Sequence, residues 1–220
     1  MQKSLTKLLD LLFENSCLIC NGSSKKNMVC DSCEKSFVSR EHNYFKTFEQ
    51  IRVYSWGYYE GKIREGIIQL KNGNKKLAGY FCKILVNFWH NIPDLTRQKD
   101  CLVIPVPSHK QRIKERGYCQ TTIIARELSK NLGFNFTDNF VRRIKETSYM
   151  TGLNNIKERI ENIKNAFEVT GENPDKKNIL IIDDILTSGN TMCELAKTIH
   201  RKYPKINLIG LTIASGDTYS

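Results

Sequence analysis

The apolar pattern near the end of the chain changes from that of a buried strand to that of a helix. Four branched apolar residues at 179–182 predict a strand that is buried on both faces of a parallel sheet. Met192, Leu195 and Ile199 then recur at helical spacing, which predicts a helix that ends near Tyr203 and Pro204. A further apolar strand is expected at 206–214. A strand, a helix and a strand in succession indicate an α/β unit.

The same alternation extends back to residue 51. Strands are predicted at 51–59 and 102–106, with helices at 61–70 and 77–89 between them. A third helix follows Tyr118 and ends at Gly133, because glycine suits the left-handed conformation of a helix end. Since proline cannot donate to a strand ladder, we expect a loop to begin at Pro105. A charged stretch at 142–167 is expected to form a mobile flap, followed by a strand at 166–169.

These elements predict an α/β fold over residues 47–220, with a mainly parallel sheet flanked by helices. Residues 1–46 are expected to form a small separate module that starts with a packing helix, because Leu5, Leu8 and Leu12 share one helical face. No apolar run approaches the roughly 20 residues that span a bilayer. We therefore expect neither a signal peptide nor insertion into a membrane.

Two carboxylates, Asp183 and Asp184, directly follow the buried run. Ligands of open α/β sheets bind at the carboxyl ends of strands, where these side chains can accept hydrogen bonds from sugar hydroxyls. The next turn can wrap a phosphate with its backbone N–H groups at the amino end of a helix. That turn consists of Thr187, Ser188, Gly189, Asn190 and Thr191. A buried strand before a capped helix would not require this combination, so we predict a site for a ribose 5-phosphate.

Four cysteines near the start of the chain form two C-x2-C pairs, Cys17 with Cys20 and Cys30 with Cys33. Two such pairs can present four thiolates to a structural zinc ion and leave no open position for catalysis. Because no export signal is visible, disulfides are the weaker interpretation, and redox-active pairs are a further alternative. The remaining cysteines are expected to be small core residues; they are Cys82, Cys101, Cys119 and Cys193.

The 220 residues carry a formal net charge of +11, and the excess is uneven. Residues 97–145 hold eleven Lys or Arg against four Asp or Glu. A solvated basic surface would account for this excess, but the cluster after the strand at 102–106 can also attract a pyrophosphate or a nucleic-acid backbone. The candidate nucleic-acid contacts are Arg112, Lys114, Arg116, Arg142 and Arg143.

The stretch ILIIDDILTSGNT, from Ile179 to Thr191, resembles the phosphoribosyl pyrophosphate (PRPP) loop of type I phosphoribosyltransferases. The cysteine pairs, the PVPSHKQRIKERGYCQ segment and this loop occur in the order found in the ComF family of competence proteins, which the chain resembles along nearly its whole length. The family usually has asparagine and glutamine where this chain has Cys119 and Met150. Further family-like positions are Gly61, Arg64, Lys71, Thr147, Leu153, Arg159, Asn162 and Phe167.

The resemblance implies a type I phosphoribosyltransferase-like fold behind a zinc module, in a cytoplasmic protein that acts on incoming single-stranded DNA during natural transformation. Asp183 and Asp184 would hold the ribose hydroxyls of PRPP, and they would be the catalytic residues if the protein is an enzyme. Ser108, His109 and Lys110 would hold the pyrophosphate together with Mg²⁺. A competence helicase or translocation channel would be a protein partner.

Two other functions are compatible with the same residues. A metabolic phosphoribosyltransferase would transfer phosphoribose from PRPP to an acceptor that the sequence does not identify, with the zinc module serving only the structure. A zinc-finger DNA adaptor would retain the sugar-phosphate site as a vestige.

Overall fold

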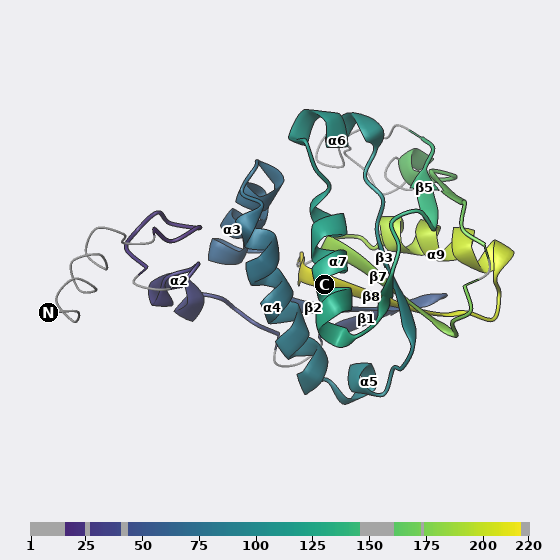
Figure 1. The fold of residues 1–220 in the computed structure, drawn as a ribbon, viewed down its shortest axis with the longest axis horizontal. Coiled ribbons are helices and arrows are strands. Elements are labelled where there is room, and N and C mark those ends of the chain that lie inside the picture. Colours follow the sequence, from purple (N-terminus) through teal and green to yellow (C-terminus); the bar gives the residue numbers. More distant parts are fainter. Residues whose placement is uncertain (1–15, 25–26, 41–43, 146–160, 173, 217–220) are drawn as a thin grey trace, which may run out of the picture.

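The main body of the protein is built on a six-stranded sheet (Figure 1). The structure is a computed structural model, and it describes residues 16–24, 27–40, 44–145, 161–172 and 174–216. The strands lie in the order β1-β2-β8-β7-β3-β4. Their bounds are β1 Phe45–Phe48, β2 Ile51–Tyr58, β3 Cys101–Pro105, β4 Asn135–Phe136, β7 Asn178–Leu186 and β8 Asn207–Ser215. Neighbouring strands are parallel except for β1 and β2. The predicted, mainly parallel α/β sheet is therefore confirmed.

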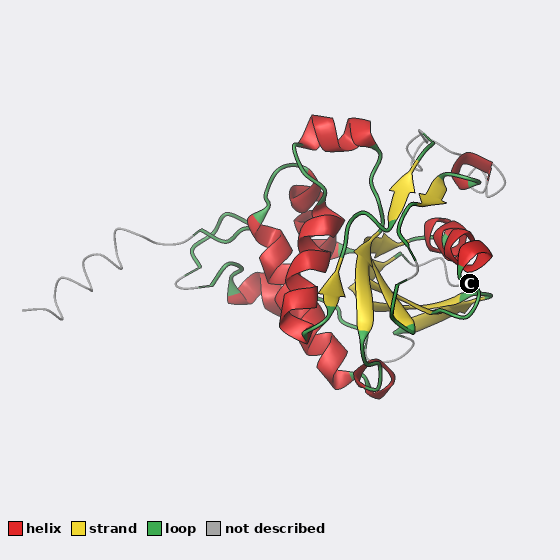
Figure 2. Ribbon diagram, turned by 45° about the vertical axis from the view of Figure 1, so that its right-hand side comes forward, coloured by secondary structure: helices red, strands yellow, loops and turns green. Residues whose placement is uncertain are grey.

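Helices cover both faces of this sheet (Figures 1 and 2). One face packs against α3 (Gly61–Lys71), α4 (Lys76–Asn91) and α7 (Gln120–Leu132), and the other against α9 (Asn190–Lys202). The buried run of β7 serves both cores, because Leu180 and Ile182 join the first while Ile179 and Ile181 join the second. A strand covered on both faces has no polar side to alternate with, which explains the continuous apolar run.

A two-stranded antiparallel ribbon of β5 (Val141–Arg143) and β6 (Phe167–Val169) lies on the α9 side. The predicted strand at 166–169 corresponds to β6, whereas β5 was not predicted. Most of the flap expected at 142–167 lies outside the described residues, as do the expected helix around Leu5 to Leu12 and the positions Thr147, Met150, Leu153 and Arg159.

The end of β3 differs from the prediction that a loop begins at Pro105. Pro105 pairs with Ile182 of β7, and the backbone N–H of Val106 still donates to the Ile182 carbonyl at 2.8 Å. Along a strand, the N–H groups of successive residues point to opposite neighbouring strands. Because the N–H of Val106 points to β7, the nitrogen of Pro105 points to the other side of β3, where β4 lies. Because β4 pairs only with Leu102 and Val103, the missing N–H of proline costs no ladder bond.

The basic segment after β3 is also not the predicted loop. Residues Lys110–Arg116 form the short helix α6, which His109 caps by accepting from the backbone N–H of Gln111 at 3.3 Å. Gly117 ends α6 in the left-handed conformation with φ of 73°, and Gly133 ends α7 in the same way, as predicted. The short elements α2 (Asp31–Lys35) and α5 (Pro93–Thr96) were not predicted either.

The cysteine module packs directly against this body. Its buried residues Cys17, Ile19, Val29 and Cys33 belong to the same hydrophobic core as α3, α4 and α7. In the part of the chain that the structure describes, every helix is too short or too polar to cross a bilayer.

Candidate ligand site and metal centre

The acid pair lies near the carboxyl end of β7. Asp183 is in register with Thr212 of β8, and the strand continues beyond the pair to Leu186. Asp184 is buried and Asp183 is partly buried. The Oδ1 atom of Asp183 accepts a hydrogen bond from the backbone N–H of Asp184 at 2.9 Å, and this bond fixes the orientation of the Asp183 carboxyl group.

Asp184 is held by side chains from two helices. Its Oδ2 atom accepts a hydrogen bond from Nε2 of Gln120 at 2.9 Å and lies 3.1 Å from Nζ of Lys71. Lys71 is the last residue of α3, and Gln120 is the first of α7. Nη1 of Arg116 in turn donates to Oε1 of Gln120 at 3.3 Å, which orients the amide so that its NH₂ group faces the carboxylate.

Asp183 has a different electrostatic environment. Burial and the neighbouring charge of Asp184 raise the pKa of Asp183 to about 7, although the Asp184 N–H bond and the charges of Lys71 and Arg143 oppose the rise. Burial and the charge of Arg112 lower the pKa of Arg143 to about 10. A carboxyl group with a pKa near 7 changes its charge around neutral pH, the pH at which a ligand would be bound.

The loop after β7 joins the acid pair to the amino end of α9. Gly189 lies at the N-cap with φ of 79°, and a Cβ atom there would come within 2.3 Å of the Phe48 ring. Only glycine accommodates both the left-handed backbone and the close approach of Phe48. Nδ2 of Asn190 is buried, and within the described residues it has no hydrogen-bond partner. A buried amide donor beside a helix amino end suits a phosphate oxygen.

The segment after β3 lies near the same edge of the sheet, since the carboxyl ends of parallel strands meet there. Oγ of Ser108 lies 3.4 Å from Sγ of Cys119, and Thr121 Oγ1 lies 3.1 Å from the same sulfur. Burial would raise the pKa of Cys119, but hydrogen bonds with Ser108 and Thr121 lower it overall. Cys119 is therefore not the simple core residue that we predicted; Cys82 and Cys101 are buried as predicted, and Cys193 is half-buried.

The structure divides the predicted nucleic-acid residues into two groups. Arg116 and Arg143 face the acid pair, the first through Gln120 and the second through its charge on Asp183. Arg142 forms an ion pair with Glu168 across the ribbon at 2.7 Å, and Lys114 is exposed on α6. The positive charge of Arg112 contributes to lowering the pKa of Arg143.

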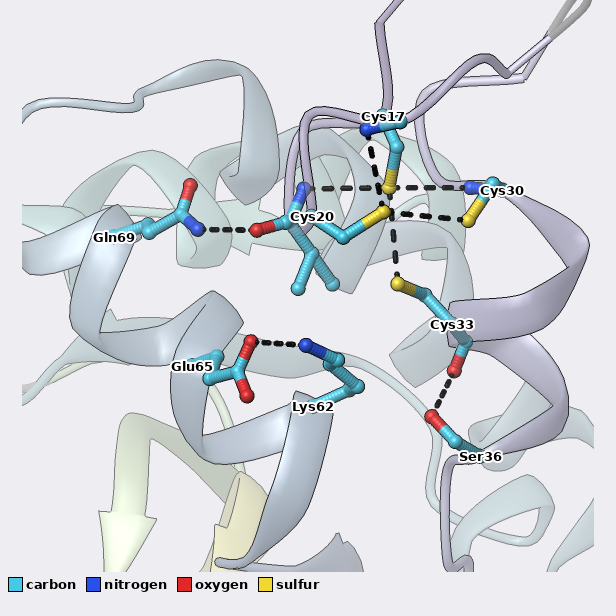
Figure 3. A network of polar contacts seen from close by, with 10 residues as sticks. Cys17, Cys20, Cys30, Cys33, Ser36, Lys62, Glu65 and Gln69 are labelled. Carbon is cyan, nitrogen blue, oxygen red and sulfur yellow. Dashed lines mark hydrogen bonds and ion pairs between the residues drawn. The ribbon is translucent and has the colours of Figure 1, made fainter.

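The four cysteines of the N-terminal module converge on one point (Figure 3). Their sulfur atoms all lie within 4.8 Å of one another, with 3.9 Å between Cys17 and Cys33 and 3.6 Å between Cys20 and Cys30. A tetrahedron of sulfur ligands at about 2.3 Å from a metal ion has edges of about 3.8 Å. The cluster therefore suits a single tetrahedral metal ion.

Backbone N–H groups also point at these sulfurs. Ile19 and Cys30 donate to Sγ of Cys17 at 3.4 and 3.3 Å, and Gly22 donates to Sγ of Cys20 at 3.4 Å. Burial alone would raise the pKa of the Cys17 thiol, but hydrogen bonds from the backbone of Cys20, Cys30 and Ile19 outweigh it and lower the pKa to about 6. Thiolates are the form that binds a metal ion, so the backbone favours metal binding by Cys17, whereas burial and the neighbouring cysteines raise the pKa of Cys33.

Sequence reasoning found the acid pair, the loop and the four cysteines but gave no role to Lys71 or Gln120. Both residues lie in segments that resemble the ComF family, and that was the only available signal. Their contacts with Asp184 span 113 and 64 positions along the chain and depend on how helices pack.

The doubly covered parallel sheet, with an acid pair and a glycine loop at the carboxyl end of a central strand, defines a type I phosphoribosyltransferase-like fold. Residues 113–217 match the family described as Phosphoribosyl transferase domain. The chain is also 34% identical over 102 residues to Competence protein F of Haemophilus influenzae, a match that covers 45% of this chain and 44% of that protein. The predicted resemblance to the ComF family is confirmed over this 45% of the chain, and its extension to nearly the whole length stays a prediction.

A second curated relative is similar over the same share of the chain. DNA utilization protein YhgH of Escherichia coli K12 is 30% identical over 100 residues, which cover 45% of this chain and 43% of that protein. The match thus spans less than half the length of either curated relative. Among solved structures, an adenine phosphoribosyltransferase is similar with a TM-score of 0.41 and 16% identity, over 64% of this chain and 71% of that one.

Proposed function

We propose that the protein is a ComF-type competence protein that binds PRPP with Mg²⁺ and acts on incoming single-stranded DNA in the cytoplasm. The observation that carries the proposal is the acid pair on β7, which runs directly into the glycine loop and the amino end of α9. The carboxylates of Asp183 and Asp184 suit ribose hydroxyls, and the backbone N–H groups of 187–191 suit the 5-phosphate. The buried Asn190 amide supports this placement of the phosphate.

Pyrophosphate would lie against the segment after β3. Ser108, His109 and Lys110 are its candidate contacts, and the charges of Arg112 and Arg143 strengthen the local positive potential. Mg²⁺ prefers oxygen ligands and keeps substrate phosphates in its coordination shell, so PRPP itself would supply much of its binding. If the site is catalytic, the carboxylates would stabilise positive charge that develops on the ribose as pyrophosphate leaves C1.

Zinc is the metal that we propose for the cysteine cluster. Four thiolates at tetrahedral spacing are a structural zinc set, and they leave no position for a reactive water molecule. The module would therefore stabilise the fold and would not take part in chemistry.

Isothermal titration calorimetry with PRPP and Mg²⁺ tests the ligand. We expect wild-type protein to bind and Asp184→Asn to lose most of its affinity, because two donors would then face an amide instead of a carboxylate. Transformation frequency in cells that carry the same substitution tests the role, with protein level as the control. Unchanged transformation would instead support a DNA adaptor with a vestigial site.

A metabolic phosphoribosyltransferase is the second candidate, favoured by the match of residues 113–217 to the phosphoribosyl transferase domain. This candidate predicts release of pyrophosphate when the protein is incubated with PRPP, Mg²⁺ and a suitable purine or pyrimidine base. Binding of PRPP without release of pyrophosphate across a panel of bases would count against it.

A further inference from the structure

A single oxygen atom of Asp184 contacts two side chains, one through an ion pair and one through a hydrogen bond. Lys71 and Gln120 both contact Oδ2, at 3.1 and 2.9 Å, from the end of one helix and the start of another. The Asp184 side chain is only 8% exposed, and that of Lys71 is 27% exposed. A buried carboxylate beside a second carboxylate is costly unless a positive charge compensates it. Lys71 supplies such a charge at ion-pair distance.

The position of Lys71 is itself well determined. The Tyr118 hydroxyl donates to the carbonyl of Leu70, the residue before it, and accepts the backbone N–H of Gly73 at 3.2 Å. Gln69 donates to the carbonyl of Ile19 in the cysteine module at 2.7 Å. The last turn of α3 is thus held on both sides, so Nζ of Lys71 can approach Asp184 with little freedom to lose.

We propose that Lys71 is a positioning residue of the phosphoribosyl site, which holds Asp184 in place and supplies the charge that keeps the acid pair able to accept hydrogen bonds from ribose hydroxyls. This inference rests on the proposed function, because it gives Lys71 a task in binding PRPP. Lys71 would act through Asp184, which its Nζ atom contacts at 3.1 Å.

The charged and polar groups around the acid pair come from four elements. Lys71 lies on α3 and Arg143 on β5, and both charges lower the pKa of Asp183 against the effects of burial and of Asp184. Arg112 of α6 acts on Arg143. From α7, Gln120 contributes a neutral amide, and Cys119 next to it is hydrogen-bonded to Ser108 and Thr121. Removing Lys71 therefore leaves Arg143 as the main opposing charge.

The first test needs no ligand. Lys71→Met keeps much of the side-chain length but removes the charge, and carbon NMR of the aspartate carboxyl groups follows their titration in the absence of PRPP. We expect the apparent pKa of Asp183 to rise by about 1, because the charge of Lys71 lowers it in the wild-type protein. Lys76→Met, which removes an exposed charge at the start of α4, should leave the titration unchanged. An unchanged titration in Lys71→Met would overturn the proposal.

The second test measures PRPP affinity against pH. With a carboxyl pKa that rises from about 7 to about 8, Lys71→Met should bind PRPP about fivefold more weakly than Lys76→Met at pH 7, but within about twofold at pH 9. Lys71→Arg should restore most of the affinity at pH 7. A purely structural role of Lys71 predicts an equal loss at both pH values, which would contradict the proposal.

The two tests separate this inference from the proposed function. If the carboxyl titration shifts as expected but wild-type protein binds no PRPP at either pH, the proposed ligand is wrong and the role of Lys71 in setting the charge of the acid pair stands. If wild-type protein binds PRPP and neither measurement responds to Lys71→Met, the proposed function stands and this inference falls.

Discussion

Two adjacent aspartates have different surroundings in this protein, although their residue type is the same. Asp184 faces Lys71 and Gln120 and is anchored by them. Asp183 is partly buried, accepts a hydrogen bond from the backbone N–H of Asp184, and has a pKa raised to about 7. At the residue scale, Asp184 is the anchor of the pair and Asp183 is the member whose charge varies near neutral pH.

The raised pKa of Asp183 leads to a prediction about ligand binding. Ribose hydroxyls donate to the ionised carboxylate, so binding should strengthen as the pH rises through about 7. Between pH 6 and 8, the ionised fraction of such a group rises about tenfold. We expect PRPP affinity to rise about tenfold more in wild-type protein than in Asp183→Asn, as measured by calorimetry. The ionisation of the PRPP phosphates affects both proteins equally, so it cancels when wild-type protein is compared with Asp183→Asn. Parallel pH profiles of affinity for the two proteins would refute the raised pKa of Asp183 as the cause.

Gly189 provides a second test at the residue scale. Gly189→Ala would introduce a Cβ into the Phe48 ring at a residue with φ of 79°. We expect it to lower the free energy of unfolding by about 1–3 kcal/mol and to weaken PRPP binding, because the loop must shift. The control is Gly79→Ala within α4, where a Cβ meets no atom within 4 Å. This variant should gain about 0.5–1 kcal/mol in chemical denaturation, and equal effects of the two would contradict the argument.

At the scale of elements, α3 joins the cysteine module to the ligand site. Its Gln69 donates to the Ile19 carbonyl at 2.7 Å, and Asn74 just after it donates to the Leu18 carbonyl at 3.2 Å. Gly66 of the same helix allows close packing, since a Cβ there would lie 3.2 Å from the Ile19 side chain. One turn further, Lys71 contacts Asp184. A displacement of the module would therefore reach the acid pair through a single helix.

Gln69→Leu tests this connection. The substitution removes the donor to Ile19 but keeps the helix, so we expect a loss of about 1 kcal/mol in the free energy of unfolding and a measurable loss of PRPP affinity. Gln111→Leu on α6 is the control for stability, because its amide contacts only the exposed Glu115 in the described part of the chain. If Gln69→Leu alters stability but leaves PRPP affinity unchanged, the module and the site are not coupled through α3.

At the scale of the whole molecule, the cysteine module is not an independent unit in its packing. Cys17, Ile19, Val29 and Cys33 share a core with α3, α4 and α7. The module has little apolar material of its own, so metal binding and this shared core would together supply its stability. The division of the chain into two domains, 1–46 and 47–220, stays a prediction. In the structure, buried residues of the cysteine module and of the main body belong to one hydrophobic core.

Removal of the metal should therefore affect the entire protein. We expect a strong chelator, or Cys17→Ser, to lower the thermal unfolding midpoint by several degrees in one cooperative transition, because the module's core is shared with the main body. Cys193→Ser, outside the cluster, is the control for loss of a thiol. A separate low-temperature transition, with the main transition unchanged, would show that the module unfolds alone.

The net charge of +11 bears on DNA binding. Phosphate contacts release counterions, so affinity for single-stranded DNA should fall with salt concentration, and Lys114→Ala should reduce the slope by about 1 in fluorescence anisotropy titrations. Lys83→Ala, an exposed lysine on α4, is the matched control and should leave the slope unchanged. Identical slopes for both variants would exclude Lys114 from the contact surface.

Local pattern predicted much of the fold correctly. The strand at 179–182, the helix ending near Tyr203 and the glycine end of α7 were all recognisable, because burial on both faces, helical periodicity and a left-handed cap leave local marks. The short β1, β4 and β5 were missed, since strands of two to four residues owe their existence to a neighbouring strand. The end of β3 was misjudged because the cost of proline depends on which neighbour its nitrogen faces.

Local sequence patterns were enough to predict two candidate sites: two carboxylates before a glycine loop, and four cysteines at metal-binding spacing. Those features are contiguous or nearly so, and their residue types limit what they can bind. The contacts of Asp184 with Lys71 and Gln120, the approach of Arg116 and Arg143 to the acid pair, and the link from the cysteine module through α3 became visible in the folded chain. Such contacts join residues far apart in the chain, and they exist only after the helices have packed on the sheet.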